Sequence, residues 1–365
     1  MKKYVKEALK ELQDSSKRTV EIELKKKNDY KKNCFRLCYN KLILGLQTRI
    51  VPSHVKNILI RTTGVKVGHD VCIPHYISFD PYFSELINLG RGCLVGGDSN
   101  LITHEVRDGK LILGKCDVAE RVLVGGGSTL LPGFKINKKS MLSIFSKCGE
   151  EIPEGELWAG KPAKILMQLT KDDIEKFFKP SNGETKEYYK EARGKIKEFN
   201  KDPSNTYLKL HYNGNRLNAG DDWWRARNFF RIWYNGVIIE ITRLLPHCFL
   251  KTLLLKMVGV KIGKNCKIGK GTVFDHLYCD NVELEDNVLI GANCYLDGHE
   301  YTITQTVFGK TLLKKGVELK PHSFVRTGTT IGENTIIESD SMAQREIPAN
   351  EVWAGVPAKF IKKND

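Results

Sequence analysis

The sequence of 365 residues lacks several features that mark common classes of protein. It has no run of about 20 uncharged apolar residues, the length that a membrane-spanning helix needs. Its first residues, MKKYVKEALKELQ, contain no apolar segment like that of a secretory leader, and they predict a short charged helix. Ten cysteines without a secretory leader argue against a disulfide framework, and none of them forms a CxxC pair. We therefore expect buried, reduced thiols and a cytoplasmic protein.

The chain also lacks an arginine-rich arm and the alternation of basic and aromatic residues that is typical of RNA-binding sheets. Its net charge of +15 nevertheless calls for an anionic partner. A phosphorylated cofactor, an anionic membrane surface and an acidic polysaccharide all fit this charge, and nucleic acid fits least well. The 32 glycines are spread along the sequence, so they indicate many tight turns rather than a low-complexity tract.

The most informative feature of the sequence is an internal duplication at a constant offset of 195 residues. Four pairs of segments carry it: Cys38-Tyr39-Asn40 with Trp233-Tyr234-Asn235, GVKVG (64–68) with GVKIG (259–263), His104-Glu105 with His299-Glu300, and WAGKPAK (158–164) with WAGVPAK (353–359). No net insertion separates the copies. A solenoid requires this, because an inserted residue would shift every later side chain off its face.

The duplication sets the predicted domain boundaries. We place the first copy at 33–168 and the second at 228–365, with a helical N-terminal arm at 1–32 and a charged helical connector at 169–227. In the connector, Thr170 followed by Asp173 predicts a helix that ends at Pro180, and a turn follows at 180–183. A second helix is expected near 184–200, packed on one of the domains through Tyr188, Tyr189, Ile196 and Phe199.

Within each copy, aliphatic residues recur about every six positions and are closely followed by a small or turn-forming residue. The second copy reads VKIG (260–263), CKIG (266–269), VELE (282–285) and VLIG (288–291). Such a hexad builds a triangular coil of three short strands, and stacked coils bury a continuous aliphatic column. The predicted fold class is therefore mainly β: two tandem left-handed parallel β-helix domains, each preceded by helical cap segments, with a helical connector.

Two matching segments, 36–61 and 231–256, are apolar and basic, and each is broken by a central proline, Pro52 or Pro246. One interpretation is a helical cap over the open end of each solenoid. The other is a helix that lies in the headgroup region of an anionic membrane, which would place the protein at the inner face of that membrane.

Both copies resemble the hexapeptide-repeat acyltransferase superfamily, and within it the sugar and polysaccharide O-acetyltransferases. The resemblance covers about 270 of the 365 residues and rests on five features: the GVKVG or GVKIG opening, the Phe79-Asp80 and Phe274-Asp275 pairs, the hexads, the His-Glu loop and the closing WAG-x-PAK. It implies left-handed β-helices assembled as homotrimers, with active sites between neighbouring prisms. It also implies acetyl-CoA as the acyl donor, a histidine as general base and no metal ion.

The candidate general bases are His104 and His299, which interrupt the hexads at the same register. A loop that leaves a solenoid often carries function. An imidazole titrates near neutrality, so it can take a proton from a hydroxyl that attacks a thioester. The following Glu105 and Glu300 could orient the imidazole, bind an acceptor hydroxyl, or have no role.

The resemblance also implies substrate contacts. A polar residue, here Asp80 or Asp275, helps to hold the acceptor, although an aspartate in this place can equally cap a buried turn. Donor binding needs small residues beside the pantetheine arm and cations near the phosphates. The candidates in the first copy are Gly125, Gly126, Gly127, Ser128, Gly160, Lys161 and Lys164. Those in the second copy are Arg326, Arg345, Gly355, Lys359 and Lys362.

The two copies differ at the donor position, because residues 320–323 of the second copy read KPHS and depart from the small-residue pattern. Which copy is more active therefore stays open, and one active copy beside one structural copy is an alternative to two sites. Trp158 and Trp353 are expected to pack on the last coil of each copy as a lid.

Several functions remain open on the sequence alone. The main prediction is direct transfer of an acetyl group to a sugar hydroxyl of a cell-surface polysaccharide or its precursor. N-acetylation of an amino sugar or a small molecule keeps the fold and changes the acceptor. A zinc-dependent carbonic anhydrase of this fold needs three convergent histidines, two of them close in sequence, and His69, His75, His276 and His322 supply no such pair. A non-enzymatic trimeric scaffold is the alternative from a different class.

Overall fold

The computed structural model describes residues 1–26, 28–172, 184–202, 204–213, 218, 223–301 and 305–364. The chain divides into two compact units, one made mainly of Met1–Lys179 and the other of Pro180–Asn218 with Asp222–Asp365. The connector helix predicted to end at Pro180 and the turn predicted at 180–183 lie, from residue 173 onward, outside the described residues. Within the described residues, every helix is too short or too polar to span a bilayer.

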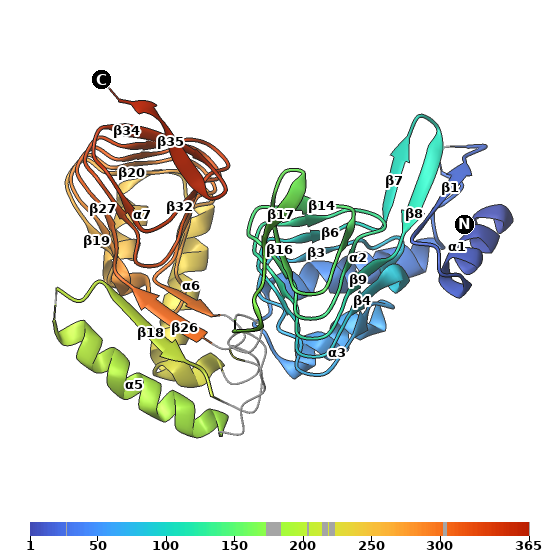
Figure 1. The fold of residues 1–365 in the computed structure, drawn as a ribbon, viewed down its shortest axis with the longest axis horizontal. Coiled ribbons are helices and arrows are strands. Elements are labelled where there is room, and N and C mark those ends of the chain that lie inside the picture. Colours follow the sequence, from blue (N-terminus) through green and yellow to red (C-terminus); the bar gives the residue numbers. More distant parts are fainter. Residues whose placement is uncertain are drawn as a thin grey trace. The chain divides into compact units, whose positions relative to one another are not determined.

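The first unit is built from short strands that wind into three parallel sheets (Figure 1). One sheet holds β2 (Lys66–Val67), β4 (Ile87–Leu89), β9 (Cys116–Val118), β12 (Lys135–Ile136) and β15 (Glu151–Ile152). The next holds β5 (Leu94–Val95), β10 (Leu123–Val124), β13 (Met141–Leu142) and β16 (Glu156–Gly160), with β17 (Ala163–Gln168) antiparallel at its end. The last holds β3 (Ser78–Phe79), β6 (Asn100–Leu101), β11 (Thr129–Leu130) and β14 (Lys147–Cys148).

The second unit repeats this arrangement (Figure 1). One sheet holds β19 (Lys261–Ile262), β22 (Val282–Leu284), β27 (Thr311–Leu313), β30 (Thr330–Ile331) and β33 (Glu346–Ile347). The next holds β20 (Lys267–Ile268), β23 (Leu289–Ile290), β28 (Glu318–Leu319), β31 (Ile336–Ile337), β34 (Glu351–Gly355) and the antiparallel β35 (Ala358–Lys363). The last holds β21 (Val273–Phe274), β24 (Tyr295–Leu296), β29 (Phe324–Val325) and β32 (Met342–Ala343).

Each strand turns one apolar residue toward the axis of its coil. Val95, Val124 and Leu142 are paired in register from coil to coil, and all three are fully buried. Because successive strands along the chain enter the three sheets in turn, every coil adds one such residue to each sheet. The prediction of stacked parallel coils around an aliphatic column is confirmed.

Two helices precede the coils in each unit. They are α2 (Cys34–Leu46) and α3 (His54–Thr62) in the first, and α6 (Phe229–Leu244) and α7 (Phe249–Met257) in the second. Asn33 and Asn228 cap α2 and α6, since each side chain accepts a hydrogen bond from a backbone N–H of the first turn. The inner faces of the helices are buried against the coils through Leu44 and Ile60, and through Ile239 and Leu255.

A buried lysine ties each helix pair to its neighbouring loop and coil. The Nζ atom of Lys56 donates to the carbonyl oxygens of Ile50 at 3.0 Å and Pro74 at 2.6 Å. Lys251, at the same register of the second copy, donates to the carbonyl oxygens of Leu245 at 3.3 Å and Gly269 at 2.6 Å. Both side chains are fully buried, and the hydrogen bonds offset the free-energy cost of burying their amines.

Outside the coils, each copy carries a small antiparallel sheet. Strands β7 (His104–Arg107) and β8 (Lys110–Gly114) form a hairpin in the first unit, and β25 (His299–Tyr301) and β26 (Gln305–Gly309) do so in the second. A third strand is added in both copies: β1 (Thr19–Glu23) pairs with β8, and β18 (Tyr207–His211) pairs with β26.

The third strands show that the predicted arm and connector are counterparts. Thr19 pairs with Gly114 and Tyr207 pairs with Gly309. The two glycines stand at the same position of the two copies. Each strand follows a helix, α1 (Lys3–Asp14) or α5 (Thr185–Lys201). The repeated unit is therefore larger than the sequence motifs indicate. The sequence motifs do not reveal this larger repeat because the segment between the third strand and the cap helices is longer in the second copy (212–228) than in the first (24–33), which breaks the constant offset.

Candidate active site

His104 begins strand β7, at the point where the hairpin leaves the coil. Its ring Nδ1 is hydrogen-bonded to Oδ2 of Asp80, the residue that follows strand β3. Asp80 Oδ2 also accepts a hydrogen bond from the Thr103 hydroxyl at 2.8 Å, and its Oδ1 accepts one from the backbone N–H of Tyr82 at 2.8 Å. The Asp80 side chain is 4% exposed and that of His104 is 17% exposed, so a fixed carboxylate holds a ring that solvent still reaches.

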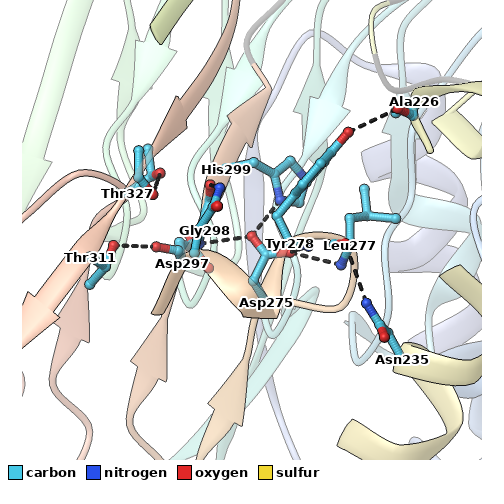
Figure 2. A network of polar contacts seen from close by, with 12 residues as sticks. Ala226, Asn235, Asp275, Leu277, Tyr278, Asp297, Gly298, His299, Thr311 and Thr327 are labelled. Carbon is cyan, nitrogen blue, oxygen red and sulfur yellow. Dashed lines mark hydrogen bonds and ion pairs between the residues drawn. The ribbon is translucent and has the colours of Figure 1, made fainter. Parts of the chain in front are cut away.

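The second copy repeats this arrangement around Asp275 and His299 (Figure 2). Oδ2 of Asp275 is bonded to Nδ1 of His299 and accepts from the backbone N–H of Gly298 at 2.8 Å. Its Oδ1 accepts from the backbone N–H groups of Leu277 and Tyr278, both at 2.8 Å. The side chain of Asp275 is 1% exposed and that of His299 is 16% exposed, which matches the first copy closely.

The electrostatics of the pair set which imidazole nitrogen is basic. Burial alone would raise the pKa of Asp80, but the hydrogen bond and charge of His104 outweigh it and hold that pKa below its ordinary value. Burial opposes ionisation of Asp275 as well, yet His299 and two backbone N–H groups lower its pKa to about 2. Both carboxylates are therefore ionised at neutral pH and accept the proton on Nδ1, which leaves the Nε2 lone pair as the basic atom.

Aromatic rings surround both imidazoles. The rings near His104 are Tyr82, Phe83 and Tyr30, with centroids at 5.1, 5.4 and 5.5 Å. Those near His299 are Tyr301, Tyr278 and Phe308, at 4.7, 5.5 and 6.5 Å. These rings were not predicted from the sequence. A signal existed, because an aromatic residue stands three positions after the aspartate in both copies, Phe83 after Asp80 and Tyr278 after Asp275.

The two glutamates that follow the histidines lie in different surroundings. Glu105 is half exposed, and its carboxylate lies 3.6 Å from the guanidinium of Arg107. Glu300 is bound at two points by Arg326, with Nε to Oε1 at 2.7 Å and Nη2 to Oε2 at 2.5 Å. Nδ1 of each histidine donates its hydrogen bond to an aspartate, so Asp80 and Asp275, rather than the glutamates, orient the imidazoles.

Arg326, predicted to bind donor phosphates, is paired with Glu300 of the same unit, and its side chain is still 40% exposed. Besides its two bonds to Glu300, its Nη1 donates to Oε1 of Gln344 at 2.9 Å. Leu131 stands at the register of Arg326 in the first copy. The second copy also has Asp297 where the first has Ile102, and the pKa of Asp297 is raised well above its ordinary value by burial and by nearby Asp275. The second site is therefore the more polar one.

The glycines predicted to bind the donor have a packing role at this corner. A Cβ on Gly125 would clash with the backbone of Ile144 in the next coil, and one on Gly126 would meet the carbonyl oxygen of Gly97 at 3.0 Å. Gly127 has φ +66°, which favours glycine. The Ser128 hydroxyl is buried and donates to the Ser143 carbonyl at 3.0 Å. Gly126 and Gly127 are partly exposed, whereas Gly125 and Ser128 are buried.

The closing motifs lie at the end of each solenoid. Trp158 and Trp353 pack on the two aliphatic columns, and each indole Nε1 donates to a nearby glutamate, as predicted for a lid. Gly160 and Gly355 both have φ +102° at the turn into the last strand. The predicted cations of these motifs and of the second copy are exposed: Lys161, Lys164, Arg345, Lys359 and Lys362.

The described residues contain no group of three His, Cys, Asp or Glu side chains placed to hold a metal ion. Of the histidines considered for zinc, His276 is bonded through Nε2 to Glu240 Oε1 at 2.8 Å. His322 lies at an exposed coil corner with φ +62°.

Comparisons with known proteins give relatives for part of the chain. No family model matches the sequence. A Bacillus subtilis protein named "Putative acetyltransferase YvoF" is 28% identical over 128 residues, which cover 35% of this chain and 73% of that protein. Gamma carbonic anhydrase 2 of Arabidopsis thaliana mitochondria is 35% identical over 80 residues, which cover 21% of this chain and only 27% of that enzyme.

Among solved structures, a hexapeptide-repeat acetyltransferase from Vibrio cholerae O1 biovar eltor, VCA0836, was crystallised with acetyl-CoA. It shares 14% identity with this chain at a TM-score of 0.34, and the match covers 39% of this chain and 92% of that one.

Proposed function

We propose that this chain, which belongs to the hexapeptide-repeat acyltransferase superfamily, moves an acetyl group from acetyl-CoA to a sugar hydroxyl. The acceptor is a sugar of a cell-surface polysaccharide or of its precursor. One observation carries the proposal: a buried aspartate and a partly exposed histidine are paired at the same register of both copies, with Nε2 as the basic atom. General bases for acyl transfer have this arrangement, in which a carboxylate fixes the tautomer of the imidazole.

The chemistry follows from the protonation state of the imidazole. Nε2 of His104 or His299 takes the proton of the acceptor hydroxyl while the oxygen forms a bond to the thioester carbonyl carbon. The carbon–sulfur bond then breaks, and the imidazolium returns the proton to the thiolate of coenzyme A. Asp80 or Asp275 stabilises the imidazolium between these two transfers. The products are the acetyl ester of the sugar and free coenzyme A, so atoms and charge balance without a covalent enzyme intermediate.

The first copy has the better fit to the donor. The corner at 125–128 has partly exposed Gly126 and Gly127 where a pantetheine arm needs small side chains, and exposed Lys161 and Lys164 can meet its phosphates. At the same corner of the second copy stand the exposed side chains of Pro321 and His322. We therefore expect the first site to have the lower KM for acetyl-CoA. We propose that both sites are active.

Assembly and acceptor binding complete the proposal. We propose that both units are left-handed β-helices and that three chains associate, because prisms of this kind leave flat flanks that relatives bury as trimers. A neighbouring prism would then close the cleft over each imidazole. Of the aromatic rings beside the histidines, those of Tyr30, Tyr82 and Tyr301 are partly exposed and suit the apolar face of a sugar ring.

A thiol-release assay tests the activity. Purified protein is incubated with acetyl-CoA and a panel of glycans, sugar nucleotides, amino sugars and water alone. We expect release with hydroxyl acceptors, and loss of about 100-fold or more in the His104→Ala, His299→Ala double variant. Release only with amino sugars would assign N-acetylation. Background release with every acceptor, unchanged in the double variant, would favour the non-enzymatic scaffold.

A further inference from the structure

The helix pairs that cap the coils expose an unusual number of large apolar side chains on their outer faces. In the first unit Phe35 is 85% exposed, and in the second Phe230 and Phe249 are 78% and 81% exposed. Five positions are exposed and apolar in both copies at the same register: 35 and 230, 42 and 237, 46 and 241, 55 and 250, 58 and 253. Since an apolar surface of this size usually marks a binding site, its repetition in both copies calls for a partner.

The exposed residues are gathered on one side of each helix. In α2 the side chains Phe35, Tyr39, Leu42 and Leu46 follow at intervals of four, three and four residues, which is one face of an α-helix. In α6 the same face carries Phe230, Trp233, Val237, Ile241 and Leu244. The inner faces of these helices are already buried against the coils. Each helix thus has two apolar faces, and only one of them is used by the fold.

The charges on the helix pairs have a single sign. Residues 34–62 contain no aspartate or glutamate and carry Arg36, Lys41, Arg49 and Arg61 beside the buried Lys56. Residues 229–257 carry Arg231, Arg243 and Lys256 beside the buried Lys251, and their single acidic residue, Glu240, is paired with His276. Positive charge flanks the apolar side chains in both copies, so the partner of these faces is anionic as well as apolar.

We propose that the outer faces of the α2–α3 and α6–α7 helix pairs bind an anionic lipid surface. The aromatic and aliphatic side chains enter the boundary between headgroups and acyl chains, and the exposed cations contact the headgroups. These exposed cations are Arg36, Lys41, Arg49 and Lys256. A second copy of the chain is a poorer occupant, because two faces of net positive charge repel each other when they meet. The proposal does not depend on acetyl transfer, but it would bring both histidines close to lipid-linked sugars.

Co-sedimentation of the full-length protein with vesicles tests the proposal. Two compositions are compared, phosphatidylcholine alone and phosphatidylcholine mixed with phosphatidylglycerol. We expect binding to the mixed vesicles only, with weaker binding at high salt. The Phe35→Ser, Phe230→Ser double variant should bind about tenfold more weakly or worse, because both rings lose their burial in the lipid. The Lys41→Gln, Arg49→Gln variant should also bind more weakly than the unchanged protein at low salt. This difference should disappear at high salt, where the charges are screened.

The matched control is Phe360→Ser, which removes an exposed aromatic residue from strand β35, away from the helices. It should bind vesicles as the unchanged protein does. Equal binding to both compositions, or to neither, overturns the proposal. So does a Phe35→Ser, Phe230→Ser variant that dissociates an oligomer in light scattering while vesicle binding stays unchanged, since the faces would then join protein to protein.

Discussion

Arg227 and Asp280 form a two-point ion pair, with Nη1 to Oδ1 at 2.8 Å and Nη2 to Oδ2 at 2.5 Å. Lys32 and Glu85 hold the same positions in the first copy, where Nζ lies 2.6 Å from Oε2. The pair joins the segment before the cap helices to the first coil in both units. Its repetition with different residue types indicates that a cation and a carboxylate are needed there, rather than a particular side chain.

We predict that Arg227 positions the aromatic wall of the second site. Its guanidinium lies 5.2 Å from the ring centroid of Tyr278, which contacts His299. In a His104→Ala background, Arg227→Ala should lower the rate of thiol release about tenfold, because the ring and the imidazole lose their fixed placement. Arg227→Lys should keep most of the rate, since lysine serves at this position in the first copy. Equal losses in both variants would contradict a role that needs only a cation.

The negative charge of Asp275 should matter more for kcat than the size of its side chain. In the His104→Ala background, Asp275→Asn keeps the size of the side chain but can donate a hydrogen bond to Nδ1, which moves the imidazole proton to Nε2. We expect kcat to fall by roughly 100-fold to 10,000-fold with little change in KM for acetyl-CoA. Asp80→Asn in the same background is the matched control, because its partner histidine is absent, and it should leave kcat unchanged.

Acid should weaken the second unit through Asp275. Its pKa is about 2 in the folded protein, below the ordinary value of 3.8. The unfolded chain therefore binds more protons in this range, and the stabilisation is complete above about pH 4 and disappears as pH falls through about 2. The size is about 2 kcal/mol in the free energy of unfolding. Urea unfolding of Asp275→Asn and of the unchanged protein should differ by about this amount at pH 6, and the difference should shrink at pH 3. A difference independent of pH would refute the linkage.

Alkaline pH should have the opposite effect through the buried lysines. Burial lowers the pKa of Lys56 to about 7 and that of Lys251 to about 8, because the charged amine is disfavoured away from water. An unfolded lysine titrates near pH 10.4, so the free energy of unfolding should rise between about pH 7 and pH 10, by roughly 3 to 5 kcal/mol for Lys56. Lys56→Met should remove most of this rise in unfolding free energies measured at pH 7 and pH 9.5, and Lys251 should account for the smaller rise that remains. The exposed Lys66→Met serves as control and should retain it.

Substitution of Gly125 should show that coil spacing, rather than donor contact, is its first requirement. Gly125→Ala places a Cβ against the backbone of Ile144, so the next coil must move, and we expect a loss of several kcal/mol in unfolding free energy. Gly194 in α5 has nothing near its Cβ position, and Gly194→Ala should stabilise by about 0.5–1 kcal/mol. Calorimetry distinguishes the two. An unchanged melting temperature in Gly125→Ala would show that the corner tolerates a side chain.

Much of this architecture follows from the sequence because the hexad is a local rule. One inward aliphatic residue and one turn residue per strand suffice to specify a coil, and the constant offset of 195 residues specifies that the coils occur twice. The histidines were found for the same reason, since they interrupt that regular pattern at matching positions. Asp80 and Asp275 were also identified, but as residues that hold the acceptor. Their hydrogen bonds to Nδ1 were not predicted, because each bond joins residues 24 positions apart in the sequence.

Other features depend on tertiary contacts that no short motif records. The pairing of β1 with β8 and of β18 with β26 joins residues nearly 100 positions apart through backbone hydrogen bonds, and these place few demands on side-chain type. The ion pair of Arg326 with Glu300 also depends on tertiary structure, because the stacked coils bring these two side chains to the same corner. The sequence by itself determined the repeat and the two imidazoles. The fold alone decided which nitrogen is basic, what lies around it, and which helix faces remain exposed, because these depend on distances between segments far apart in the chain.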